Sequence, residues 1–258
     1  GFFGRINYNY KERYLLEING RYDGSSRFTK DNRWGFFPAA SVGWRISEEA
    51  FIKDNVSWIS NLKLRLGWGK TGNEELDPDD IYPAIPTYAY EKYMFGNSLY
   101  STAYESRYVN NNLQWATVTN YELGLEAGFL NNMFGFELSV YKKKTNDMLL
   151  YMPIQGVIGM GAPAQNAGSV ENTGFDLNLL HNNRINKDWS YAVNLNIAYV
   201  KNEIIDMNGT EGANSKNDKL WYIEGNPIGS YYGYVANGYF NTDDELANYP
   251  KRTGKEQL

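Results

Sequence analysis

The sequence of 258 residues contains no cysteine and a single histidine, His181. The lack of cysteine excludes disulfides, thiolate nucleophiles and zinc-thiolate sites, and it leaves the redox compartment open. One histidine leaves little scope for a multi-histidine metal site, and no G-x-S-x-G nucleophile elbow accompanies it. We therefore expect no enzyme, with no catalytic residue, cofactor or metal ion, and we interpret His181 as a residue near a strand end.

The sequence also lacks an apolar run of the roughly 18 to 20 residues that a membrane-spanning helix needs. Its formal net charge is -5, and its lysines and arginines are interspersed with acids. This balance gives nucleic-acid binding no electrostatic support. Lys142, Lys143 and Lys144 are therefore interpreted as the solvent-exposed end of a strand. The first residues, GFFGR, have neither the basic start nor the apolar core of a signal peptide.

Aromatic residues, in contrast, are abundant at 16% of the chain, and they lie in segments that alternate apolar with polar residues. Such alternation places successive side chains on opposite faces of a β-strand. In residues 189–199 every odd position is apolar or aromatic, and every even position is small or an amide. The pattern predicts eight strands and a ninth within 220–240; the eight lie at residues 2–10, 13–23, 36–47, 62–69, 120–129, 134–141, 169–181 and 189–199.

Many of these segments exceed the roughly 5 to 6 residues usual for soluble strands and match the about 9 to 11 residues of membrane strands. The connections between them alternate between short, at 11–12, 131–132 and 182–188, and long, at 24–35, 70–118, 145–168 and 202–219. Residues 48–61 break this alternation, and the sequence SEEAFI, with Ser47 as N-cap, predicts a short helix there. Long loops on one side and short turns on the other are typical of an outer-membrane barrel.

The two faces of the predicted strands agree with this layout. In a large barrel the apolar face meets lipid and the polar face lines an aqueous lumen, while closure pairs the backbone groups within the bilayer. Within residues 21–37 we expect Arg21 and Asp23 to face the lumen, Tyr22 to face lipid, and Trp34 to Phe37 to lie at the interface. The sequence favours an all-β fold, an antiparallel transmembrane β-barrel, here partial with about 8–10 strands and long extracellular loops. The alternative is a soluble all-β protein whose Tyr and Trp reflect strand propensity.

Two short motifs suggest ligands but lack the required context. Asp77-Pro78-Asp79-Asp80 offers oxygen ligands for calcium, but its spacing does not match an EF-hand, so a solvated turn is the simpler interpretation. Residues 159–164, GMGAPA, resemble the dinucleotide fingerprint, but no strand-turn-helix unit surrounds them. We interpret residues 155–168 as a flexible extracellular loop.

The connection at 82–108 is rich in tyrosine, and Tyr88, Tyr90, Tyr93 and Tyr104 are the candidate ligand-binding residues. Tyrosine rings combine apolar area with a polar tip, so they can stack on sugars or grip peptide side chains. The alternative is a folded loop that its own aromatic residues hold together.

Several segments together resemble the SusC/RagA-type TonB-dependent outer-membrane transporters of Bacteroidetes. They occur in the family's order, from Phe2 to Phe240, with the weakest correspondence at 74–108 and with Ala116 where the family commonly has Glu. The segments are YLLEINGRYDGSSRFTKDNRWGFFPAASVGWRISEEAF, ISNLKLRLGWGKTGN, NNNLQWATVTNYELGLEAGFLNNMFGFELSVYKKKTNDML, NAGSVENTGFDL and GNPIGSYYGY.

This resemblance implies a barrel of about 22 strands with a plugged lumen. Residues 1–258 are then expected to form part of a single barrel domain, as an internal fragment with no plug domain, signal peptide or TonB box. The implied function is active import of nutrients across the bacterial outer membrane, with glycans or oligosaccharides as the expected cargo and peptides also known for the family. The implied partners are a SusD-like surface lipoprotein, the TonB complex through regions absent here, and outer-membrane lipid. A passive porin and a soluble carbohydrate-binding or adhesive β-protein are the alternatives.

Overall fold

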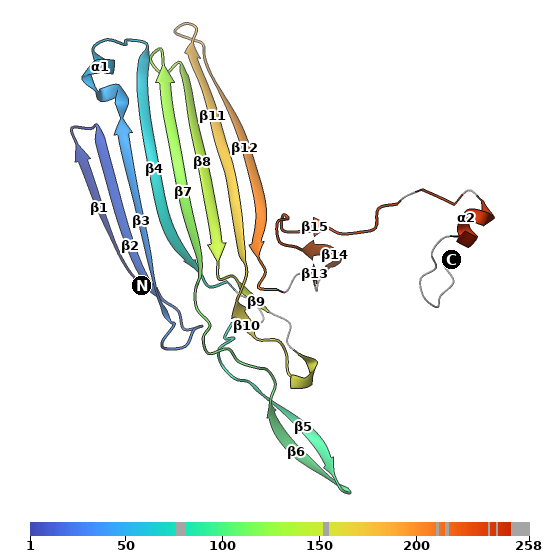
Figure 1. Cartoon of the computed structure of the whole chain (residues 1–258). Helices are drawn as coiled ribbons and strands as arrows, with labels where there is room; N and C mark the ends of the chain where they lie inside the picture. The colour runs from blue at the N-terminus through green and yellow to red at the C-terminus, as the bar shows by residue number, and fades with distance from the viewer. Residues whose placement is uncertain are drawn as a thin grey trace.

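The computed structural model describes residues 1–75, 81–151, 155–209, 212–214, 217–236, 238–240 and 242–248. Eight antiparallel strands form one curved sheet, which is an open wall and not a closed barrel (Figure 1). All eight predicted strands are confirmed. In sheet order they are β1 (Phe2–Tyr10), β2 (Tyr14–Gly24), β3 (Trp34–Arg45), β4 (Ile59–Asn73), β7 (Ala116–Phe129), β8 (Phe134–Asn146), β11 (Ser169–Arg184) and β12 (Ser190–Asp206).

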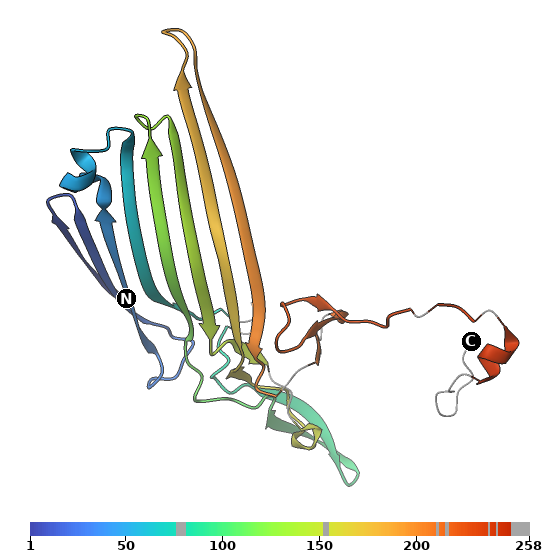
Figure 2. The same ribbon diagram turned by 45° about the horizontal axis from the view of Figure 1, so that its top comes forward.

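The short connections gather at one end of the wall and the long ones at the other, as predicted (Figure 2). Two of the short connections, residues 11–13 and 130–133, each contain a turn with positive φ at both central residues, Lys11-Glu12 and Asn131-Asn132. Each turn is closed by a backbone hydrogen bond, from Arg13 N to Tyr10 O in the first case (3.0 Å). Turns of this kind match the twist of antiparallel strands and therefore fix their register.

The helix predicted near residues 48–61 exists, but its predicted cap is wrong. The chain forms a 3-10 turn, η1 (Ile46–Glu48), followed by α1 (Ala50–Lys53). Ser47 lies buried inside η1, and Glu49 occupies the N-cap position of α1 without a side-chain capping bond. No helix in the described ranges is long and apolar enough to cross a membrane.

The ninth strand predicted within 220–240 does not join the wall. That region contributes β14 (Asn217–Tyr222) and β15 (Ser230–Tyr231) to a small separate sheet with β13 (Gly212–Asn214). Gly225 and Gly229, with φ of 77° and 76°, turn the chain between the two strands, so a long strand cannot form there. A short helix, α2 (Asp243–Asn248), follows.

The outer face of the wall carries aromatic rings at a constant interval. On five strands a ring at the loop-side edge is matched by another ring eight residues away at the turn-side edge. Eight residues span about 27 Å along a strand, and a tilt of about 40° leaves about 21 Å across the bilayer, near the apolar band of about 25 Å in outer-membrane barrels. The pairs are Phe2 and Tyr10, Tyr22 and Tyr14, Phe36 and Trp44, Tyr121 and Phe129, and Tyr199 and Tyr191.

A cluster of buried apolar residues lies among the loops at one end of the wall. Phe28, Leu113 and Ala164 come from three different connections, are at most 3% exposed, and pack with Trp115 and Leu149. Distant loops therefore share one apolar cluster.

Phe37 corrects the prediction that residues 34–37 lie together at the interface. It is 7% exposed and contacts the ring of Trp115 edge-on at 5.3 Å, whereas Trp34 remains exposed and stacks on Tyr22 at 4.9 Å. Its register partner is Arg21, on the lumen face, so alternation directs Phe37 inward.

Candidate functional site

The concave inner face of the wall contains a hollow with a volume of about 960 Å³. Alternation brings polar residues of neighbouring strands into register on this face, while the apolar residues between them point outward. Its polar side chains belong to Glu17, Asn19, Ser41, Thr71, Asn120, Glu122, Glu137, Ser139, Tyr141, Lys143, Asp176, Asn178 and Asn196.

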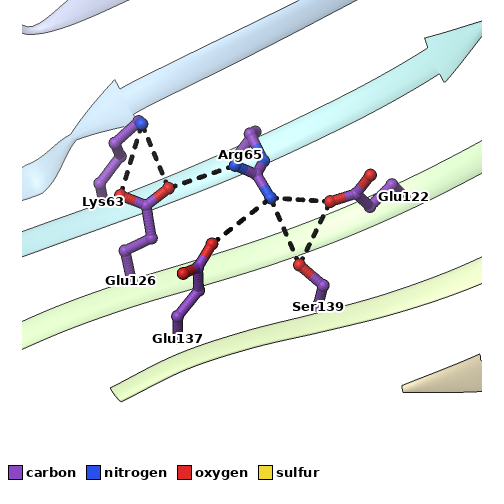
Figure 3. Close-up of polar contacts among 6 residues, drawn as sticks. All are labelled: Lys63, Arg65, Glu122, Glu126, Glu137 and Ser139. Carbon is purple, nitrogen blue, oxygen red and sulfur yellow. Dashed lines mark hydrogen bonds and ion pairs between the residues drawn. The ribbon is translucent and has the colours of Figure 1, made fainter. Parts of the chain in front are cut away.

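Arg65 on β4 is the centre of an ion-pair cluster on this inner face (Figure 3). Its guanidinium lies 2.7 Å from the carboxylate of Glu122 on β7 and 3.9 Å from that of Glu137 on β8. It also donates to the hydroxyl of Ser139 at 3.3 Å, and that hydroxyl donates to Glu122 at 3.2 Å. One arginine thus ties together three adjacent strands.

Glu126 on β7 completes the cluster. It accepts from Lys63 at 3.2 Å and from Arg65 at 3.3 Å. The absence of a side chain at Gly124 leaves room for the guanidinium, because a Cβ atom there would lie 3.1 Å from the Arg65 side chain. The cluster holds three carboxylates and two cations, so it presents a slight negative surplus to the lumen.

The tyrosine-rich connection contains a hairpin that the sequence interpretation missed. Strands β5 (Tyr88–Phe95) and β6 (Ser98–Glu105) pair around a two-residue turn, with Gly96 at a φ of 60° (Figure 1). A Gly-Asn pair between two aromatic runs is a recognised hairpin signal and would have identified it.

The four candidate tyrosines fall on opposite faces of this hairpin. Tyr93 and Tyr104 share one face with Tyr100, whereas Tyr88 and Tyr90 share the other. All five rings are exposed, so the hairpin is not held together by buried aromatic residues. A hydrogen bond to the Glu91 carboxylate raises the pKa of Tyr104, which places a polar group beside the rings of the first face.

Polar contacts tie the loops above the lumen to one another, and none of them was predicted from the sequence. The indole of Trp115 donates to Arg33 O at 3.0 Å. Asn166 exchanges hydrogen bonds with Gln114, at 2.7 and 2.8 Å, across 52 residues of sequence. Ala116, the position that departs from the family's Glu, is buried at the start of β7 opposite Asn73.

The structure places two of the three remaining sequence features within the described residues. His181 lies near the end of β11, as predicted, between the ring of Phe134 at 4.3 Å and the hydroxyl of Tyr191 at 2.9 Å. The motif at residues 159–164 leads into the short strand β10 (Ala164–Asn166) and not into a helix, in agreement with the rejection of a dinucleotide site. The motif at residues 77–80 lies outside the described residues, and within the described ranges no group of His, Asp and Glu could hold a metal ion.

Together these features define part of an outer-membrane β-barrel: an apolar outer face, a polar inner face, and long loops at one end. The family described as "TonB dependent receptor-like, beta-barrel" matches residues 1–255. The chain belongs to this family. The resemblance seen in the sequence, the barrel fold and the outer-membrane location are therefore confirmed. Members of the family are transporters and not enzymes, which bears out the expectation of no reaction chemistry.

Individual relatives agree with this assignment. The chain is 38% identical over 248 residues to "TonB-dependent receptor SusC" of Bacteroides thetaiotaomicron, covering 93% of this chain and 24% of that protein. It is 37% identical over 211 residues to "TonB-dependent receptor P26" of Formosa agariphila, covering 81% of this chain and 21% of that protein. The solved RagAB peptide transporter superposes with a TM-score of 0.76 at 29% identity, over 88% of this chain and 24% of that one. The chain thus spans about a quarter of the length of these relatives.

Proposed function

We propose that this wall belongs to a TonB-dependent active importer of nutrients, with oligosaccharides as its cargo. The observation that carries the proposal is the family match over residues 1–255 together with the polar inner face. An open sheet would leave unpaired backbone groups at the edges β1 and β12, so in the bilayer the wall closes with further strands. Amide and carboxylate side chains around the hollow suit a hydrated, hydroxyl-rich cargo.

The proposed partner at the cell surface is a SusD-like lipoprotein, and the proposed energy source is the TonB complex. The similarity to SusC supports this assignment, as does the likeness to the RagAB transporter. RagAB is described as a peptide transporter, so peptide is the competing cargo.

An uptake assay with cells that carry or lack the complete gene tests this function. Fluorescent oligosaccharides and peptides of matched size are supplied with and without a protonophore. We expect oligosaccharide uptake to require both the gene and the proton-motive force. Gene-dependent uptake that is unchanged by the protonophore would indicate a passive porin. Gene-dependent uptake of peptides only would overturn the proposed cargo.

The β5–β6 hairpin is the proposed contact for the cargo, through Tyr93 and Tyr104 on the face that also holds Glu91. Rings beside a carboxylate can stack on a sugar and bind its hydroxyls at once. In the complete protein, the double change Tyr93→Ala and Tyr104→Ala should weaken oligosaccharide binding about 5- to 30-fold by calorimetry, at about 0.5 to 1 kcal/mol per ring. Changing Tyr88 and Tyr90 to Ala is the matched control; an equal loss there would contradict the assignment to one face.

A further inference from the structure

Strand β8 breaks the aromatic interval of the outer face. Its turn-side edge is marked by Phe134, and eight residues further, where other strands have a ring, it carries Lys142. Lys144 follows on the same face, one alternation nearer the loops. A cation thus stands at the level where the apolar band ends.

The register gathers further polar groups at this level. Lys142 lies opposite Tyr121 on β7, and Lys144 lies opposite Thr119. Thr119 in turn lies opposite Lys70 on β4, so one strand separates Lys70 from Lys144. Adjacent strands are about 4.8 Å apart, which brings these two long side chains within reach of a single anion above Thr119.

The charges at this level do not balance. Glu171 pairs with Lys142 at 2.7 Å, and Glu203 pairs with Lys201 at 2.6 Å. Lys70 and Lys144 form no ion pair with any residue that the structure describes. Four lysines against two glutamates leave a positive surplus on this part of the outer face.

A shallow apolar groove of about 600 Å³ lies directly below, on the side of the membrane interior. Lys142 stands at its loop-side end, and Tyr121 borders it there. Its apolar lining comes from Val42, Leu66, Trp68, Leu123 and Val140. The surface therefore combines room for a hydrocarbon chain with cations at one end.

We propose that this surface binds a phosphorylated lipid of the outer leaflet. An acyl chain lies in the groove, and the phosphate lies above Thr119 between Lys70 and Lys144, with Lys142 below it. A long lysine side chain can keep its stem along apolar surface while its ammonium reaches the headgroup level. Anionic headgroups attract lysines placed at the membrane surface, and each such lysine strengthens the attraction severalfold. The inference concerns the lipid side of the wall and does not depend on the cargo.

The test uses the complete protein, purified free of lipid and reconstituted in nanodiscs that contain either diphosphoryl lipid A or its dephosphorylated form. Retained lipid A is counted by native mass spectrometry. We expect retention of the phosphorylated form, reduced about fivefold by Lys144→Gln and about 25-fold by Lys70→Gln with Lys144→Gln, since each lysine at the membrane surface contributes about fivefold.

Lys143→Gln is the matched control, because Lys143 is the sequence neighbour of Lys144 but lines the inner hollow. It should leave lipid retention unchanged, and circular dichroism and heat-modifiable gel mobility should show that all variants are folded. Equal retention of both lipid forms, or an equal loss in Lys143→Gln, would overturn the proposal. Displacement of the lipid by millimolar inorganic phosphate would point to a free-phosphate site and would also overturn it.

Discussion

The inner and outer faces of the wall are made from alternate residues of the same strands, but different interactions govern them. On β12 the outer residues are Tyr191, Val193, Leu195, Ile197 and Tyr199, and the inner ones are amides and alanines. The outer face depends on lipid to cover apolar area, whereas the inner face holds itself together through hydrogen bonds and the ion pairs around Arg65. The same substitution at two neighbouring positions, one on each face, should therefore change the free energy of unfolding by very different amounts.

The largest expected effect is that of a charge placed on the outer face. Leu195→Arg puts a cation halfway between the rings of Tyr191 and Tyr199 and should lower the free energy of unfolding by about 2 to 4 kcal/mol. The same change at the neighbouring inner position, Asn196→Arg, should cost little. Urea unfolding of the complete barrel in lipid vesicles, followed by tryptophan fluorescence, measures both; similar losses would break the distinction between the faces.

Where the inner face is closely packed, a larger side chain should lower the stability of the barrel more than an added charge does. A Cβ atom at Gly174 would lie 2.8 Å from the Tyr141 hydroxyl and closer still to the Tyr199 carbonyl oxygen. Gly174→Ala should therefore destabilise the barrel by about 1 to 3 kcal/mol in the same assay. Gly67→Ala is the control, since its nearest neighbour is Glu122 Cβ at 3.8 Å, and a comparable loss there would contradict the packing argument.

The ion-pair cluster should contribute a moderate amount of stability. Arg65→Gln leaves Glu122 and Glu126 without their shared guanidinium and should cost about 1 to 2 kcal/mol, since the groups are only partly buried. Glu137→Gln should cost less than about 0.5 kcal/mol, because this carboxylate is 47% exposed and 3.9 Å from Arg65. A gain of stability in Glu137→Gln would show that the negative surplus governs this face, and a larger loss for Glu137 than for Arg65 would contradict the pairing assigned to Arg65.

The smallest effect concerns the turn-side edge, where Glu49 accepts hydrogen bonds from the Tyr14 hydroxyl at 2.8 Å and the Trp44 indole at 3.1 Å. These bonds, that of Tyr14 first, hold the pKa of Glu49 below its ordinary value. A lowered pKa in the folded state means stability that is present above the ordinary pKa of about 4.3 and lost as pH falls through the folded value. Urea titrations between pH 6 and pH 3 should show this loss, and Glu49→Gln should abolish it. An unchanged acid dependence in Tyr14→Phe would contradict the assigned cause.

The strands and their faces were predictable because alternation is a local property of the sequence, and the eight-stranded wall follows it closely. The contacts among Phe28, Leu113 and Ala164 were not, because they join loops that are distant in sequence. The burial of Phe37 was missed for the same reason, since its ring contacts Trp115, which packs against that cluster, and does not lie in the interfacial belt. Ser47 was misassigned because a preferred capping residue is no guide when the chain first makes a 3-10 turn.

The Arg65 cluster was hidden in the sequence for a related reason. Its members come from β4, β7 and β8, and only the strand register brings them together. The β5–β6 hairpin, in contrast, carried the local signal of Gly96-Asn97 between two aromatic runs.

The most direct test of the opposed faces is a spin-label scan of residues 191–199 in the complete protein in lipid vesicles. Residues 1–258 contain no cysteine, so no native thiol has to be removed from this wall before single cysteines are introduced and labelled one at a time. Oxygen, which partitions into lipid, should broaden the signals of the odd positions, and a water-soluble nickel chelate those of the even positions. The account predicts two period-two patterns in opposite phase. Patterns in phase, or equal access of the chelate to both sets of positions, would contradict it.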